Sequence, residues 1–379
     1  MNLFDVLSLR VLIGIWGALL VFYTLSSATC SFVLPRGENV RLTRWVFLVM
    51  RNLFNVFSGT VRSYEQRDRV MALFAPTTLL ILPVIWVMLI LFGYACIYWA
   101  LGVQPFFRAV EMSGSALLTL GTTPYETVTT TLFEFSEATI GLGIVALLIA
   151  YLPTMYSAFS SREAQVTMLE VRAGSPPSAL EFISRLSRIQ GLDENYLNSL
   201  WRAWEEWFSY MEESHTSLAP LVFFRSPDPQ RSWITAAGAI LDSAALIEST
   251  VDIRHDPQAQ LMLRSGYLAL QAIADTFRIP YDPHPKPDDP ISIGQDEFDE
   301  VYSELAALGV PLRPDREQAW RDFAGWRVNY DLVLLRLAAL VMAPYAPWSS
   351  DRSLPWMGKA RTLHDIYEEQ RQIAAARKR

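Results

Sequence analysis

A run of small hydroxyl-bearing residues interrupts the apolar amino-terminal part of the chain. The segment 113–124 reads SGSALLTLGTTP. Hydroxyl and backbone carbonyl oxygens can replace the hydration shell of a cation. Non-helical backbone at membrane depth is tolerated only where protein buries it or where it lines a watery cavity. The pattern therefore indicates coordination of a dehydrated cation, and the candidate residues are Thr119, Leu120, Gly121, Thr122 and Thr123.

Three uncharged apolar runs surround or precede this segment, at 11–34, 74–101 and 138–160. About 20 apolar residues in a helix cross a bilayer, so each run is long enough to span. The first run could instead be a signal peptide, but its apolar core is long and no small-residue cleavage site is evident. With 51% hydrophobic residues and a mean hydropathy of +0.19, the chain is expected to be a membrane protein.

The distribution of arginine predicts the orientation of the spans. The loop 35–73 is rich in arginine, whereas 102–137 holds only Arg108. We expect the chain in the plasma or inner membrane of the cell. By the positive-inside rule, the loop 35–73 and the large carboxy-terminal region should lie in the cytoplasm, and the amino terminus should lie outside. Residues 43–58 contain arginines and aromatic residues in an amphipathic pattern, which predicts a helix along the inner membrane surface.

The oxygen-rich segment follows a predicted short helix. Residues 105–118 carry apolar side chains near helical spacing, and the filter-like 119–124 comes directly after them. The alternative is a small-residue segment that lets membrane helices pack closely. Pro124 and the threonine-rich 127–131 break helical continuity and favour a loop that re-enters the membrane.

This arrangement resembles the tetrameric potassium-channel family. The resemblance covers an outer helix (74–101), a pore helix (about 105–118), the filter TLGTTP (119–124) and an inner helix (about 132–160). The family's filter reads T-V-G-Y-G-D, so Thr122 and Thr123 stand where the family has an aromatic residue and a second glycine. The resemblance implies a homotetramer that conducts K⁺, Na⁺ or both, and the two threonines predict weak discrimination between them.

Acidic residues and helix-bending residues lie on either side of the predicted filter. Four glutamates near the expected outer mouth would favour cations: Glu111, Glu126, Glu134 and Glu137. The inner helix contains three positions where a helix can bend, Gly141, Gly143 and Pro153. In the resembled family such residues are gating hinges. The alternative for the two glycines is that they are points of close helix contact.

Residues 161–379 show helical patterning and little strand character. Predicted helices cover 197–214, 232–253, 259–277 and 321–342, and a proline-rich connector covers 279–294. The aromatic stripe of 197–214 is expected to be a helix core. The four histidines are far apart in sequence: His215, His255, His284 and His364. The pair His255-Asp256 beside Asp252 is either a cation site or, as we expect, solvated surface charge.

The sequence therefore predicts an all-α membrane protein with three transmembrane helices, a re-entrant pore helix and filter loop, and an α-helical cytoplasmic domain. The domains are an amino-terminal span (1–34), an interfacial linker (35–73), a pore domain (74–160) and the helical domain (161–379). The expected activity is cation conduction by a homo-oligomer, a tetramer by resemblance alone, without cofactor, metal site or enzymatic role. The expected partners are the lipid bilayer, further copies of the chain and an unknown cytoplasmic ligand.

Two alternatives to a channel stay open at this stage. One is a membrane-tethered signalling or scaffold protein whose transmembrane part does not conduct. The other is a membrane-anchored enzyme with its active site in 161–379, although no catalytic constellation or phosphate-binding motif is present in that region. The net charge of −7 argues against nucleic-acid binding.

Overall fold

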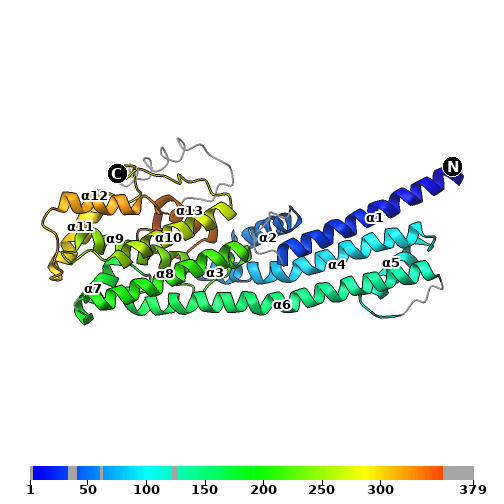
Figure 1. Ribbon diagram of the computed structural model, residues 1–379, viewed down its shortest axis with the longest axis horizontal. Helices are drawn as coiled ribbons and strands as arrows, with labels where there is room; N and C mark the ends of the chain where they lie inside the picture. The colour runs from blue at the N-terminus through cyan, green and yellow to red at the C-terminus, as the bar shows by residue number, and fades with distance from the viewer. Residues whose placement is uncertain (1–2, 33–40, 60–62, 122–126, 191, 353–379) are drawn as a thin grey trace. The chain divides into compact units, whose positions relative to one another are not determined.

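The computed structural model describes residues 3–32, 41–59, 63–121, 127–190 and 192–352 (Figure 1). In these residues all regular elements are helical, and the only strand-like pairing is an isolated bridge between Val251 and Leu312. The described chain forms two compact units. The apolar unit contains residues up to 157 apart from 63–69, and the charged unit contains 63–69 together with residues from 158 onward.

Among the described residues, three helices are long and apolar enough to cross a membrane, as in a multi-pass membrane protein. They are α1 (Leu3–Phe32), α4 (Phe74–Ala100) and α6 (Val128–Ala173), and the candidate span at α4 extends back to Tyr64. At a rise of 1.5 Å per residue, the 27 residues of α4 reach roughly 40 Å. The three predicted spans are thus confirmed as long apolar helices. Their orientation across a membrane stays a prediction.

The third span differs from its prediction in length. The sequence predicted a span at 138–160, but α6 is one helix of 46 residues that begins at Val128 and ends at Ala173. The predicted boundary between pore and cytoplasmic domains, at 160/161, therefore falls inside a helix. Loss of apolar character after residue 160 marks where a membrane could end, but it does not interrupt the backbone hydrogen bonds of a helix.

Helix α1 packs against α4 through small residues. A Cβ atom at Gly17 would collide with the backbone oxygen of Gly93, so the two helices approach closely at this pair. Nearby, the rings of Trp16 and Phe92 meet edge-on with centroids 5.9 Å apart. Close backbone approach through glycine is a common way for membrane helices to associate. Lipid tails are as apolar as the helix side chains, so association depends on close van der Waals packing and not on the hydrophobic effect.

The arginine-rich segment predicted as an amphipathic helix is α2 (Arg41–Gly59). It packs against α4, where Phe47 and Phe54 both contact Phe74 with ring centroids 6.1 and 5.8 Å apart. The helix is confirmed, whereas its position along a membrane surface stays a prediction. It is followed by the short α3 (Tyr64–Ala72).

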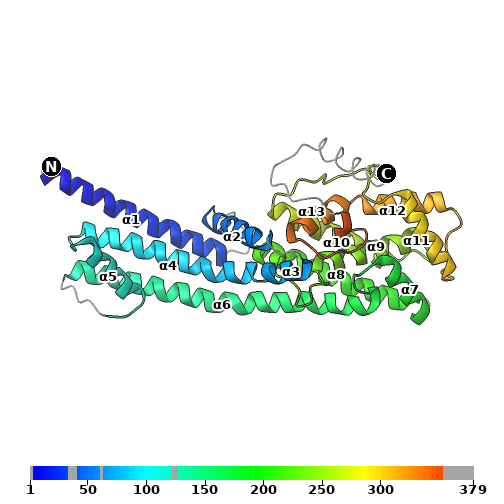
Figure 2. The same cartoon turned by 180° about the vertical axis from the view of Figure 1, so that it is seen from behind.

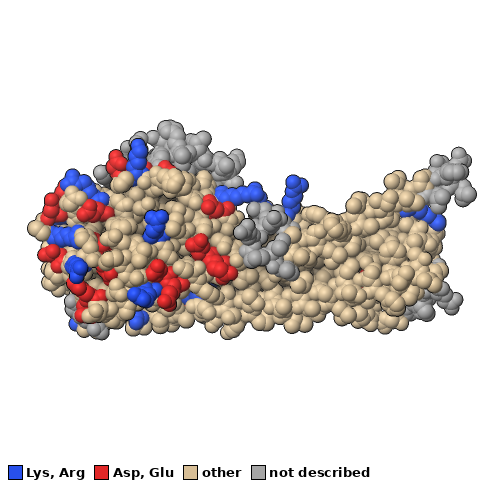
Figure 3. Space-filling view, viewed as in Figure 1, with Lys and Arg blue, Asp and Glu red and all other residues tan. Residues whose placement is uncertain are grey.

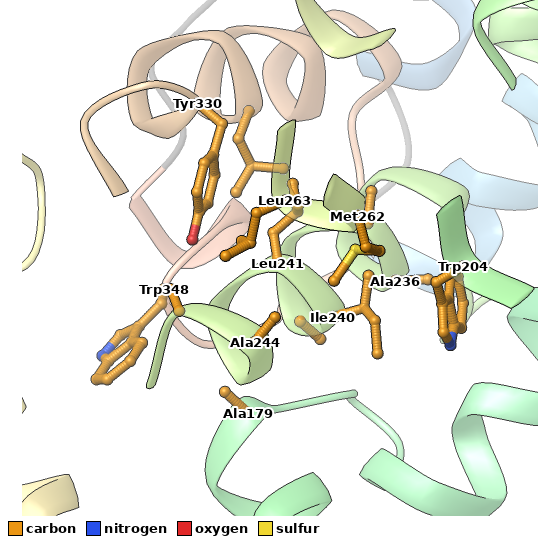
Figure 4. Packing of buried hydrophobic residues seen from close by; sticks show 14 of the residues in the cluster. Ala179, Trp204, Ala236, Ile240, Leu241, Ala244, Met262, Leu263, Tyr330 and Trp348 are labelled. Carbon is orange, nitrogen blue, oxygen red and sulfur yellow. The ribbon is translucent and has the colours of Figure 1, made fainter. Parts of the chain in front are cut away.

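The charged unit is a helical bundle around α9 (Trp233–Thr250), whose residues are all buried. The surrounding elements are α7 (Ala179–Gln190), α8 (Glu194–Ser217), η1 (Ala219–Phe223), α10 (Pro257–Thr276), α11 (Gln295–Ala307), α12 (Arg316–Arg327), α13 (Asp331–Val341) and η2 (Ser350–Arg352). Helices α7, α10, α12 and α13 contact α9 directly (Figure 2). Figure 4 shows Ile240 and Leu241 of α9 among side chains from α8 and α10.

Two sequence expectations for this unit are confirmed. The aromatic stripe lies in the core, since Trp201, Trp204 and Phe208 of α8 are buried. The proline-rich 279–294 lacks regular structure and connects α10 to α11. Figure 3 shows charged side chains gathered over the charged unit, whereas the visible surface of the apolar unit carries few.

A third expectation for this unit is wrong, because the single helix predicted at 321–342 is two helices, α12 and α13, separated by a turn. Arg327 at the end of α12 donates to the carboxylate of Asp331 at 2.8 Å and also bonds Asp242 of α9. Tyr330 in the turn donates to Asp242 at 2.9 Å. All four side chains are buried, so the turn brings complementary charges into the core.

Candidate functional site

The oxygen-rich segment begins where α5 (Phe106–Leu117) ends. This helix lies between α4 and α6 in sequence and packs on α4. The amide of Thr119 donates to the carbonyl of Ala116 at 3.1 Å, and the amide of Leu120 donates to that of Ser115 at 2.8 Å. This pair of bonds is the Schellman pattern that closes a helix with a left-handed residue. The short helix predicted at 105–118 is therefore confirmed as a helix.

The backbone alternates after α5. Thr119 has a φ of 56° and Gly121 a φ of 66°, whereas Leu120 between them does not have a positive φ. The sequence predicted a non-helical, filter-like loop here, and residues 119–121 belong to neither a helix nor a strand. The reason is that the Schellman bonds require a left-handed residue directly after the helix. Thr122 and Thr123 lie outside the described residues.

Alternating backbone handedness has a chemical consequence. It directs successive amide groups to one side of the chain and the carbonyl groups to the other. Thr119 is β-branched, and a left-handed conformation costs such a residue on the order of 1–2 kcal/mol. Backbone strain of this kind persists only where surrounding structure imposes it, and it clusters at functional sites. Thr119, Leu120 and Gly121 are exposed on the single chain.

A buried carboxyl group lies behind this segment. Glu137 on α6 is 0% exposed and receives a hydrogen bond from the Tyr98 hydroxyl of α4 at 2.9 Å. The Ser113 hydroxyl oxygen of α5 lies 2.5 Å from the other carboxyl oxygen. The same hydroxyl lies 2.9 Å from the carbonyl oxygen of Leu91 on α4. One carboxyl group thus links α4, α5 and α6.

The burial of Glu137 corrects its expected place at an outer mouth. Its phase on α6 directs it at α4 and α5, and hydropathy alone does not reveal that phase. The other predicted mouth residues differ among themselves. Glu111 is exposed and pairs with Arg108 at 3.3 Å, Glu134 is half-buried, and Glu126 lies outside the described residues.

The three predicted hinge residues lie within the continuous helix α6. A Cβ atom at Gly141 would collide with the backbone oxygen of Leu117, so this glycine is a close-contact point for the end of α5. Gly143 has no atom within 4 Å of such a position, and Pro153 is exposed. The structure therefore gives Gly141 the packing role that the sequence left as an alternative. Hinge motion at the other two stays a prediction.

Sequence reasoning missed Tyr98 and Ser113, the partners of Glu137. Both occur in segments assigned to a span or a pore helix, where only charged residues were considered for electrostatic roles. A signal for them was present, because polar side chains in apolar helices need hydrogen-bond partners once they are buried. Which residue is that partner depends on how the helices pack, because Glu137 lies 39 residues from Tyr98 and 24 residues from Ser113 in sequence.

In the charged unit, the His255-Asp256 pair borders a surface hollow of about 220 Å³. The His255 ring is 61% exposed and lies 3.2 Å from the buried Glu248 carboxylate. Asp256 caps α10 through the amide of Gln258. Its side chain therefore performs a helix-capping role. In the described residues no group of three or more histidine, cysteine, aspartate or glutamate side chains could hold a metal ion.

Comparison of the chain with protein-family models, curated proteins and solved structures found no match. The function of the chain is therefore inferred from its own geometry.

Proposed function

We propose that the chain is one subunit of a potassium-channel-like, pore-loop cation channel with weak selectivity between K⁺ and Na⁺. One observation carries this proposal. The short helix α5 lies between two candidate membrane spans and ends in the exposed 119–121, where φ is positive at Thr119 and Gly121 but not at Leu120. Carbonyl groups aligned in this way are suitable ligands for a dehydrated monovalent cation. In this role α5 is a pore helix and 119–121 is the inner part of a filter.

Conduction through such a filter requires several copies of the chain. One chain contributes one α5 and one set of carbonyl oxygens, which can contact an ion from one side only. Closed rotational symmetry brings equivalent segments around an axis and surrounds the ion. The resemblance to potassium channels favours four copies. An exposed apolar row on α6 supports such assembly: Leu132, Phe135, Leu142, Val145 and Ile149.

Weak selectivity follows from the residues after Gly121. Thr122 and Thr123 stand in place of the aromatic residue and glycine of the potassium-channel filter. Threonine resists the left-handed conformations that glycine allows, so fewer ordered carbonyl sites are expected in the outer half. Glu111 is exposed close to α5's centre and would favour cations over anions.

Contacts in the charged unit support coupling between this unit and the inner helix. Arg162 of α6 is buried and donates to the carbonyl oxygens of Leu221 and Phe224 at 3.0 and 2.7 Å. The indole of Trp207 donates to the carbonyl of Arg162 at 3.3 Å. The last part of α6 is thus held by the helical bundle. Since α6 is continuous from residue 128, movement of the bundle would bend or rotate the inner helix.

The proposal is tested by recording currents from the purified full-length chain in planar bilayers. We expect single-channel cation currents whose reversal potential in opposed K⁺ and Na⁺ gradients indicates weak selectivity. Gly121→Ala should change selectivity and lower conductance, because a left-handed alanine costs about 1–2 kcal/mol. Gly102→Ala is the matched control, since Gly102 also has a positive φ and open space where a Cβ atom would lie, yet precedes α5.

Two results would contradict a channel. The first is the absence of current in a folded, oligomeric preparation, which would favour the membrane-tethered scaffold. The second is a current that Gly121→Ala and Gly102→Ala alter equally, because the effect would then come from backbone strain in general and not from a filter.

A further inference from the structure

The Ser113 hydroxyl has one proton and two neighbouring acceptors. Its oxygen lies 2.9 Å from the Leu91 carbonyl oxygen, which can only accept, and 2.5 Å from a carboxyl oxygen of Glu137. If Glu137 is ionised, its carboxylate can only accept as well. The single Ser113 proton can then be donated to only one of the two acceptors, and the other acceptor receives no hydrogen bond from Ser113.

A proton on Glu137 completes the network. The carboxylic acid O–H then donates to the Ser113 oxygen, and the Ser113 O–H donates to the Leu91 carbonyl. The Tyr98 O–H donates to the second carboxyl oxygen at 2.9 Å. Three donors meet three acceptors, and each hydrogen bond has its proton. Neutral Glu137 is thus the form that matches all the observed contacts.

In the described part of the chain, Glu137 has hydrogen-bond donors but no cationic partner to compensate for a negative charge. Besides Tyr98, the ionisable side chains on α4, on α5 and on α6 up to Glu137 are Tyr94, Cys96, Arg108, Glu111 and Glu134. Arg108 is exposed and paired with Glu111, and Tyr94 bonds Ser136 at 2.8 Å. Among the described residues, no lysine or arginine forms a salt bridge with Glu137. An ionised carboxylate buried without a cationic partner is costly, above all within a membrane.

We propose that Glu137 is a proton-binding site, occupied at neutral pH, that fastens α5 to α4 and α6. Loss of this proton at alkaline pH removes one hydrogen bond at Ser113 and introduces an unpaired charge beside α5. Since α5 carries the 119–121 segment, the proton controls how firmly that segment is held. The proton site itself follows from contacts alone, whereas its effect on currents rests on the proposed channel function.

The test of proton binding is infrared spectroscopy of the full-length chain in lipid nanodiscs at neutral pH. We expect a carbonyl stretching band of a protonated carboxyl group that Glu137→Gln removes. Tyr98→Phe should shift this band, because it deletes one hydrogen bond to the acid. Glu134→Gln, one turn earlier on α6, is the matched control and should leave the band in place. A spectrum that Glu137→Gln leaves unchanged would overturn the proposal.

Glu137→Gln also provides a test of the fastening role. The glutamine amide can donate to Ser113 and accept from Tyr98, so it imitates the neutral acid at every pH. We expect hydrogen exchange in 106–117 to rise at alkaline pH beyond the intrinsic pH effect in the unsubstituted chain, but not in the glutamine variant. Equal acceleration in both proteins would contradict the fastening role. If the chain is a channel, its current should change at alkaline pH, and Glu137→Gln should remove this change. The infrared and hydrogen-exchange tests do not require ion conduction, so they test the proton site even if the chain conducts no ions.

Discussion

At the scale of single residues, the core of the charged unit contains a buried arginine paired with two buried carboxylates. Arg327 is 0% exposed and lies between the carboxylates of Asp242 and Asp331. Burial alone would lower the pKa of Arg327, but these two carboxylates outweigh burial and raise it. The guanidinium also donates to the Trp348 carbonyl oxygen at 2.5 Å, which connects α12 to the segment after α13. Removing one partner of such a group leaves uncompensated charge in the core.

Replacing this arginine should therefore destabilise the bundle strongly. We expect Arg327→Ala to lower the free energy of unfolding of the charged unit by about 3–5 kcal/mol, because two buried aspartates lose their cation. The control is Arg316→Ala. Arg316 and its partner Asp299 are each at least about a third exposed, so loss of this ion pair should lower the free energy of unfolding by less than about 1 kcal/mol. Denaturant unfolding followed by hydrogen exchange in 233–250 measures both. Equal effects of the two substitutions would contradict the role of Arg327.

At the scale of elements, α5 packs on α4 and is connected to α6 by two contacts of different kinds. Its middle is held by the hydroxyl of Ser113 at Glu137. Its end meets α6 at Gly141, where no side chain fits against the Leu117 carbonyl oxygen. A helix of 12 residues has little stability of its own in water, so tertiary contacts of this kind determine its position.

The Gly141 contact predicts a contrast between neighbouring glycines. Gly141→Ala should displace the end of α5 and reduce thermal stability, since the added methyl group meets backbone and not a flexible side chain. Overpacking of this kind typically costs about 1–3 kcal/mol. Gly143→Ala has open space and should be neutral or stabilising by roughly 0.5–1 kcal/mol, because alanine favours the helix. Thermal unfolding in nanodiscs compares them, and a greater loss at Gly143 would disprove the contact.

At the scale of the whole molecule, two arginines, Arg225 (half-buried) and Arg162 (buried), hold within the charged unit the segments that connect it to the apolar unit. Arg225 pairs with Asp68 in the segment 63–69 and donates to the Val341 carbonyl oxygen at 2.7 Å. Arg162 holds the continuation of α6. The chain thus enters and leaves the apolar unit through anchored segments. Under the proposed function, this arrangement lets a ligand of the helical bundle act on the pore.

The proposed function also predicts the assembled mass. One chain weighs 43.0 kDa, and we expect native mass spectrometry of the protein released from nanodiscs to show four chains. The exposed row on α6 should form the contact between copies, so Leu142→Glu is expected to shift the population towards single chains. Met168→Glu, an exposed apolar position on the same helix in the charged unit, is the control. A folded chain that remains single without substitution would exclude a shared pore.

Several elements of this protein were predictable from sequence because their causes are local. Long uncharged runs predicted α1 and α4, arginines among aromatics predicted α2, and helical spacing predicted α5. Hydropathy and periodicity are properties of a short stretch of sequence, so they indicate a helix whatever the rest of the fold is. The burial of the α8 aromatic stripe was predictable for the same reason.

Other features were decided only by the tertiary structure. The partners of Glu137, the contact at Gly141 and the turn that divides α12 from α13 each depend on which helix faces meet. Arg327 and Asp331 are charged residues inside the segment 321–342 that was predicted as one helix, and in the fold they form an ion pair in the core of the charged unit. The physical reason is that the cost of a polar group is set by its surroundings, and residues distant in sequence supply those surroundings.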